Sequence, residues 1–162
     1  MTHPRERIMP ERRKHYFYSL LALTILLLLS MNFIGLPLNT AAAPQGIISF
    51  EFAATPERAQ EMLDSWTPGA RVRAAFIQGL DFLYLLVYAV TFALAGLFSA
   101  NVIQRLGWPL ARLGKPVAFG FALSALFDLV ENIALVFILL GTVRSPWPEV
   151  AAVCAWLKFG LL

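Results

Sequence analysis

Four ionisable side chains and one amide interrupt stretches of the chain that are otherwise apolar. They are Asp81, Asp128, Glu131, Asn132 and Lys158. An ionised group at hydrocarbon depth is costly, so each of them needs a partner, a cavity or a bound proton. Three carboxyl groups against one ammonium leave an excess of acid, and close carboxyl groups cannot all stay ionised in a low dielectric. Such a cluster could bind a cation or an amine, exchange a proton or act as a general acid; it could equally be a structural network that fixes helix register.

Helical spacing brings these side chains together. At about 100° per residue, the three polar side chains within 128–132 share one face of a helix, and Asp81 shares a stripe of another helix with Tyr84 and Tyr88. Counted from the outer ends of their stretches at about 1.5 Å per residue, the four ionisable groups lie roughly 10 to 18 Å deep. We therefore expect one intramembrane ligand site, open toward the outer leaflet and formed by Asp81, Tyr84, Tyr88, Asp128, Glu131, Asn132 and Lys158.

The composition places these residues in a membrane protein. The chain has 162 residues, of which 59% are hydrophobic and 14% charged, and this excludes disorder and an ordinary soluble domain. Apolar stretches over 16–36, 74–100 and 116–140 are long enough to cross a hydrocarbon core of about 30 Å. A fourth stretch, 148–162, gives only about 22 Å of helix, so either it stops part-way across or the native protein continues. We favour continuation, because nothing basic or polar closes the segment.

These stretches predict an all-α fold. The whole chain forms a single transmembrane domain, an integral membrane antiparallel four-helix bundle whose contact partner is the lipid bilayer. A cleaved signal peptide is the alternative interpretation of 16–36, because the run Ala41-Ala42-Ala43 resembles a cleavage site, but the apolar part is too long for one.

The distribution of lysine and arginine predicts the orientation. The tail 1–15 and the loop 101–115 are denser in these residues than the outer segment 37–73 and the short loop that follows 140. We therefore expect a bacterial inner-membrane protein with a cytoplasmic amino terminus. The basic residues of the cytoplasmic side are Arg5, Arg7, Arg12, Arg13, Lys14, Arg105, Arg112 and Lys115, and those of the other side are Arg58, Arg71, Arg73 and Arg144.

Two local patterns stand in the outer segment. Ile48, Phe50 and Phe52 alternate with polar residues, which predicts a short extended run. Thr55 as N-cap then begins an amphipathic helix over 56–66, which lies along the membrane surface or caps the bundle.

The ends of the outer segment carry three further expectations. Trp66 is expected at the level of the lipid headgroups, and Pro68-Gly69 is expected to turn the chain back into the bilayer. Asn32, near the outer end of the first span, is expected to donate an interhelical hydrogen bond.

The sequence also excludes several kinds of chemistry. Cys154 is the single cysteine, so neither an intrachain disulfide nor a multi-cysteine metal site can form. Both histidines, His3 and His15, lie in the tail, which excludes a histidine-ligated haem or metal in the apolar part. No P-loop, zinc-protease helix or nucleophile elbow is present. We expect no cofactor, no metal and no nucleic-acid partner, because topology and anionic lipid account for the basic charge.

Three short motifs resemble those of a known group of proteins. They are Phe52-Ala-Ala-Thr-Pro-Glu-Arg-Ala-Gln60, Gly79-Leu-Asp-Phe-Leu-Tyr84 with the following Tyr88, and Asp128-Leu-Val-Glu-Asn132. Together they are similar to a group of small, uncharacterised bacterial inner-membrane proteins with four spans. The resemblance covers most of the chain and implies the four-span fold, without an activity. In that group the last span continues beyond a Lys-Phe pair like Lys158-Phe159.

Three functions compete on these observations. The first is binding of a small lipophilic or cationic ligand at the acidic cluster, coupled to protonation. The second is an accessory or scaffold subunit of a larger membrane complex, in which the polar residues only stabilise the fold. The third is a lipid-modifying enzyme that works by acid–base chemistry, although a protein without enzymatic activity is the better expectation.

Overall fold

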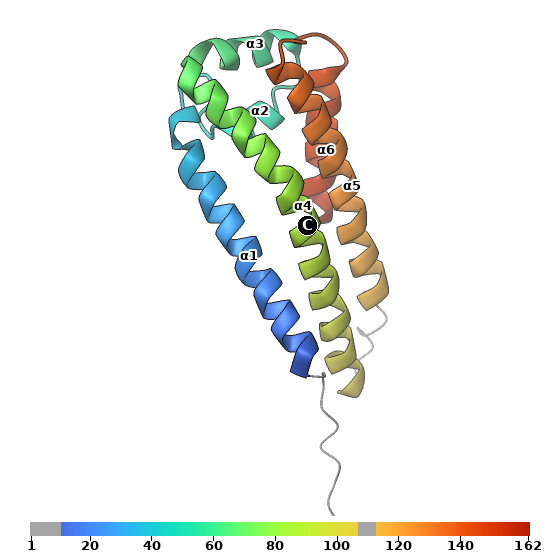
Figure 1. Cartoon of the computed structure of the whole chain (residues 1–162). Coiled ribbons are helices and arrows are strands. Elements are labelled where there is room, and N and C mark those ends of the chain that lie inside the picture. Colours follow the sequence, from blue (N-terminus) through green and yellow to red (C-terminus); the bar gives the residue numbers. More distant parts are fainter. Residues whose placement is uncertain (1–10, 107–112) are drawn as a thin grey trace, which may run out of the picture.

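The computed structural model describes residues 11–106 and 113–162 of the chain. Of the basic residues predicted on the cytoplasmic side, only Lys14 has a side chain within this description. The described chain is helical, and Figure 1 shows the course of its elements. They are α1 (Glu11–Gly35), the 3-10 helix η1 (Leu36–Leu38), α2 (Ile47–Glu51), α3 (Pro56–Ser65), α4 (Pro68–Arg105), α5 (Gly114–Leu139) and α6 (Trp147–Leu161).

Within residues 11–106 and 113–162, three helices are long and apolar enough to cross a membrane. Their apolar parts run over Lys14–Leu38, Pro68–Gln104 and Pro116–Leu139, so the protein is a membrane protein. The 38 residues of α4 make a helix roughly 57 Å long, which exceeds a hydrocarbon core of about 30 Å and extends beyond it. The 15 residues of α6 are fewer than a full span needs, and Figure 1 shows this helix ending about half-way along α4.

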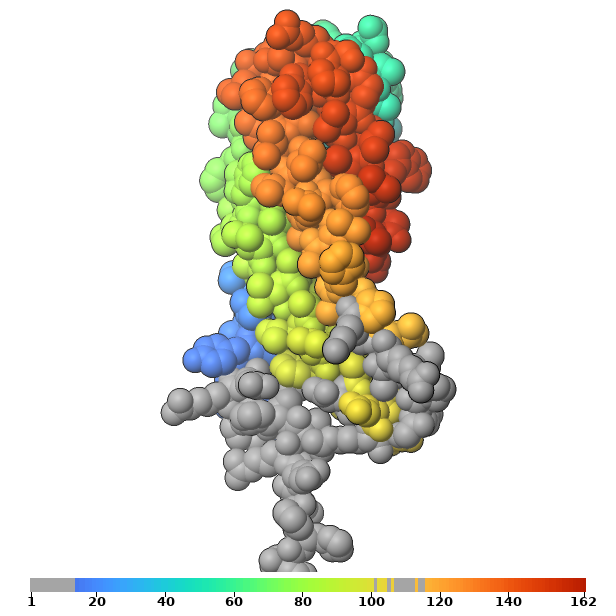
Figure 2. All heavy atoms as spheres, turned by 90° about the vertical axis from the view of Figure 1, so that its right-hand side faces the viewer, coloured from blue at the N-terminus to red at the C-terminus, as the bar shows by residue number. Residues whose placement is uncertain are grey.

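The long helices are arranged as an open arc. Among the described residues, α1 packs on α4, α4 on α5, and α5 on α6, while α1 and α6 have no comparable contact. Figure 2 shows the face away from α1, where α5 lies between α4 and α6. The predicted all-helical fold is thus confirmed, whereas the predicted four-helix membrane bundle is not: α6 is shorter than a span, and α1 and α6 do not pack together as the other neighbouring helices do.

The start of α4 corrects the sequence analysis. Thr67 caps the helix through its hydroxyl oxygen, which accepts a hydrogen bond from the backbone N–H of Ala70 at 3.2 Å, and Pro68 occupies the first helical position. Pro68-Gly69 therefore begins the helix instead of forming a turn, because proline needs no hydrogen-bond acceptor there. The helix α4 therefore begins at Pro68, six residues before the start that the sequence predicted at residue 74.

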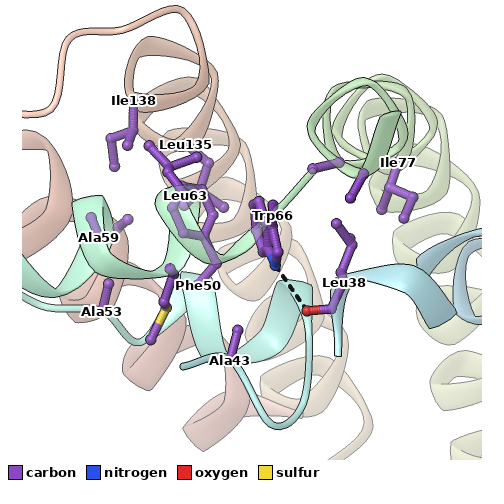
Figure 3. Packing of buried hydrophobic residues seen from close by; sticks show 14 of the residues in the cluster. Leu38, Ala43, Phe50, Ala53, Ala59, Leu63, Trp66, Ile77, Leu135 and Ile138 are labelled. Atoms are coloured by element: carbon purple, nitrogen blue, oxygen red, sulfur yellow. Dashed lines mark hydrogen bonds between the residues drawn. The ribbon is translucent and has the colours of Figure 1, made fainter. Parts of the chain in front are cut away.

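The outer segment closes one end of the arc with its own apolar core. As predicted, Thr55 caps α3, and its oxygen accepts from the N–H of Arg58 at 3.2 Å. The buried side of α3 packs above α5, and Figure 3 shows Leu63 near Leu135 of that helix. Of the two predicted roles for α3, capping the helices is therefore the correct one.

Trp66 belongs to this core and not to the lipid headgroups. Only 3% of the residue is exposed, and its indole Nε1–H donates to the carbonyl oxygen of Leu38 at 2.8 Å. Its ring lies 5.1 Å from that of Phe50, centroid to centroid (Figure 3). The prediction failed because hydrophobic burial against a folded cap competes with the headgroup preference of an exposed tryptophan.

The expected extended run is a short helix, α2. Its turn begins at Gly46, whose φ of +58° lies in the left-handed region, and a Cβ there would stand 2.6 Å from Oδ1 of Asn39. Glycine is therefore required for the chain to enter α2. Since Phe50 and Glu51 are three and four residues after Ile47, the helix turns both toward the inside of the molecule.

Candidate functional site

Lys158 of α6 is the centre of a buried ionic cluster. Its Nζ lies 2.9 Å from Oε1 of Glu131, 3.1 Å from Oδ1 of Asp128 and 3.3 Å from Oε2 of Glu51. All four residues are buried, with at most 7% of any of them exposed. The structure thus brings the predicted residues Asp128, Glu131 and Lys158 together on the facing sides of α5 and α6.

Glu51 is the member of the cluster that sequence analysis missed. It comes from α2, 107 positions before Lys158 in the chain. Burial raises the pKa of Glu51 above its ordinary value, and Lys158 opposes this shift only in part. The signal that could have found it is the helical spacing of Glu51 with Ile47 and Phe50, which assigns the acid to the apolar side of a turn.

Asp81 of α4 reaches the same region without joining the ion pairs. The residue is 8% exposed, and no lysine or arginine of the described chain lies within ion-pair distance of it. One helical turn nearer the amino terminus of α4, the side-chain amide of Gln78 donates a hydrogen bond to Oδ1 of Asn132. Asn132 therefore fixes α4 against α5, and Asp81 remains an acid without a cation.

Aromatic rings continue from Asp81 along α4. The rings of Tyr84 and Tyr88 are 5.2 Å apart, centroid to centroid, and Phe92 lies 5.8 Å beyond Tyr88. Tyr88 is buried, and its hydroxyl makes no hydrogen bond within the part of the chain that the structure describes. The polar side chains around this hydroxyl are those of Ser124 and Asp128.

These groups line a cavity of about 690 Å³, which we call the acidic cavity. Its volume lies within the usual range of about 300 to 1,000 Å³ for small-molecule sites. The polar wall is formed by Glu51, Asp81, Tyr84, Tyr88, Asp128 and Lys158. Apolar residues of α1, η1 and the end of α6 complete the lining, among them Leu28, Met31, Phe33, Leu36, Phe159 and Leu162, and the ring of Phe159 lies 4.8 Å from Nζ of Lys158.

Two predicted site residues do not line the acidic cavity. Glu131 lies behind it, fully buried, with one carboxylate oxygen on Lys158 and the other without a hydrogen-bond partner among the described residues. Asn132 is likewise enclosed between α4 and α5. Asn32 does line the cavity, but its amide donates to the carbonyl of Leu28 one turn earlier in α1, so the expected interhelical bond is absent within the described residues.

The cavity combines an acidic side with an apolar side. Four carboxyl groups, including Glu131 behind the wall, face a single ammonium, so a positively charged guest or bound protons are needed for neutrality in a low dielectric. Within the described residues, no group of three or more histidine, cysteine, aspartate and glutamate side chains has an arrangement that could hold a metal ion.

Comparison with known proteins returned no match: neither family models, nor curated proteins, nor solved structures resemble the chain significantly.

Proposed function

We propose that the protein binds a small lipophilic cation in the acidic cavity and that binding is coupled to the release of protons. The observation that carries this proposal is the charge of the cavity wall. Glu51, Asp81 and Asp128 line it against one ammonium, that of Lys158, which already contacts two of the three carboxylates.

Asp81 is the proposed partner of the ligand. Its carboxylate is buried beside the cavity with no cation of the described chain in contact, so an ammonium group in the cavity would restore a charge pair there. The neighbouring rings of Tyr84 and Tyr88 line the same cavity, and aromatic rings attract organic ammonium ions. The hydroxyl oxygen of Tyr88 can accept a hydrogen bond from an ammonium N–H.

Proton release follows from the same arrangement. Four elements supply the titratable groups around the cavity, namely α2, α4, α5 and α6. These groups are Glu51, Asp81, Tyr84, Tyr88, Asp128, Glu131 and Lys158. Because these carboxyl groups outnumber the ammonium, part of them must hold protons when the cavity contains no cation. An arriving positive charge stabilises the ionised forms and displaces protons.

The test compares three ligands that have the same hydrocarbon chain and differ in the charge of the head group. Dodecylamine, dodecanol and dodecanoate are titrated against the full chain in phosphatidylcholine nanodiscs by calorimetry, in two buffers of different ionisation enthalpy. We expect saturable binding of dodecylamine alone, with a buffer-dependent heat that reports proton release. Removing one member of a buried charge pair typically weakens binding by roughly 30-fold or more, so Asp81→Asn is expected to show a loss of that size.

Asp64→Asn is the matched control, because Asp64 is an exposed carboxylate of α3 whose partner is Arg71 on the surface. It should leave dodecylamine affinity unchanged. Equal binding of dodecanol or dodecanoate, or an Asp81→Asn variant with wild-type affinity, would overturn the proposal in favour of a purely structural cluster. A structural cluster is what an accessory subunit of a larger complex would need.

We place the protein in the bacterial inner membrane with the amino terminus in the cytoplasm, in line with the distribution of lysine and arginine. The start of α1 and the end of α4 lie at one end of the molecule, while α3 lies at the other (Figure 1). In a Cys154→Ala background, a membrane-impermeant maleimide should label Gln60→Cys on α3 in intact spheroplasts. Thr2→Cys should react only after permeabilisation, and the reverse pattern would invert the orientation.

A further inference from the structure

We infer that the ligand is an amine with a single hydrocarbon chain, and that it reaches the acidic cavity sideways from the bilayer, between α1 and α6. This inference rests on the proposed function and names the class of its ligand. It concerns the apolar wall of the cavity, which the binding of a cation alone does not require.

The opening is the unpaired side of the helical arc. Within the described residues, α1 packs on α4 but has no comparable contact with α6. The cavity is lined from both sides of this gap, by Phe33 of α1 and by Phe159 of α6. These side chains are also exposed at the surface, 73% for Phe33 and 47% for Phe159, so the cavity communicates with the outside between them.

The surroundings of the opening are hydrocarbon and not water. Leu28, Phe33 and Leu36 form the rim on the side of α1 and η1, and all three are exposed apolar residues within a stretch that is able to cross the membrane. A lipid tail can occupy such a rim without desolvating polar groups, whereas a hydrated ion cannot pass it without loss of its water.

The polarity of the cavity then fixes the orientation of the guest. Asp81 and Asp128 lie on the α4 and α5 side, and the apolar residues lie on the α1 side and at the end of α6. An ammonium head beside Asp81 therefore leaves its chain pointing toward the opening. A phosphate-bearing lipid does not fit, because Lys158 is the single basic residue of the lining and three carboxylates surround it.

The test uses a dodecylamine that carries a photoreactive diazirine at the far end of its chain. The full chain in phosphatidylcholine nanodiscs is irradiated with this probe, and the labelled residues are located by mass spectrometry. We expect the label on the rim, at Phe33, Leu36 and Phe159. Met31→Trp places a larger side chain into the apolar wall and should reduce labelling by roughly tenfold, since overfilling a packed site is unfavourable.

Leu26→Trp is the matched control, because Leu26 of α1 is 61% exposed and does not line the cavity. It should leave the labelling unchanged. One pattern would overturn the inference and keep the proposed function. In that pattern, unlabelled butylamine and dodecylamine both bind in an Asp81-dependent manner, but the photoreactive probe labels the outer segment near Asn39 and Gln45. The ligand would then reach the cavity from water. If no amine binds, the proposed function itself fails.

Discussion

The ammonium of Lys158 and the carboxylate of Glu51, 3.3 Å apart, join the end of α6 to the outer segment of the chain. The same ammonium holds Asp128 and Glu131 of α5, so one side chain links three elements in the protein interior. A buried ion pair adds little stability compared with a well-packed apolar core, but a buried carboxylate that loses its cation is costly. Lys158 is therefore the residue on which the geometry of the cluster depends.

Replacing Lys158 by methionine should destabilise the protein by about 3–5 kcal/mol, because three buried carboxyl groups would then lack their cation. The measurement is reversible unfolding by SDS in mixed micelles. The loss should be smaller at acidic pH, where the carboxyl groups are protonated. Arg144→Met removes the same charge from an exposed position and should have little effect. A wild-type unfolding midpoint for Lys158→Met would contradict the cluster.

Glu51→Gln should change how the stability of the protein depends on pH. Burial raises the pKa of Glu51 in the folded state, so folding favours its protonated form. Its contribution to stability is then fully present below the unfolded pKa and is lost as the pH rises through the folded pKa. Above the ordinary pKa of a glutamate carboxyl group, the wild type should lose stability with rising pH more steeply than Glu51→Gln does.

The matching measurement is the thermal unfolding midpoint in detergent across that pH range. Glu57→Gln, at an exposed position in the first turn of α3, should follow the wild-type profile. Parallel profiles for Glu51→Gln and the wild type would show that the proton is not held at this residue.

The sequence allowed much of the cluster to be predicted because its members follow the helical period. Asp128 and Glu131 recur one turn apart on a long helix, and a lysine in an apolar helix has few possible partners other than buried acids. Glu51 was missed because the alternation of Ile48, Phe50 and Phe52 in and directly after its five-residue helix resembles an extended run, and because its partner is far away in the chain. Asp81 was expected in the same site as Lys158, but depth and helix face alone do not determine which of the carboxylates the ammonium contacts.

The position of α1 was also beyond sequence reasoning. The hydroxyl groups of Thr24 and of Thr91 in α4, 3.1 Å apart, make one polar contact between α1 and a neighbouring helix. Neither hydroxyl differs in the sequence from others that face lipid or bond only to their own helix. Whether the helices form a closed bundle or an open arc therefore depends on packing that the hydrophobic pattern does not encode.

Gln78 and Asn132 should be energetically coupled, because the side-chain amide of the first donates to the second across the boundary between α4 and α5. Interhelical hydrogen bonds in membrane proteins contribute about 0.6 kcal/mol on average and about 1.7 kcal/mol at most. A double-mutant cycle with Gln78→Ala and Asn132→Ala, read by SDS unfolding, should give a coupling energy in that range. Additive effects of the two substitutions would show that the bond does not hold the helices together.

Trp66→Phe should destabilise the outer segment more than its change in volume suggests. The indole N–H donates to the carbonyl of Leu38 at 2.8 Å, and phenylalanine leaves this buried acceptor unpaired. An unsatisfied buried acceptor costs about 1–3 kcal/mol. Trp156→Phe is the control, because Trp156 is 71% exposed and phenylalanine retains an aromatic ring beside Phe52 of the same segment. Limited proteolysis of the segment between α1 and α4 should be faster in Trp66→Phe than in the control. Because Glu51 belongs to this segment, the affinity for dodecylamine should also fall in Trp66→Phe. Equal proteolysis of the two variants would mean that the apolar contacts of the core alone hold the cap in place.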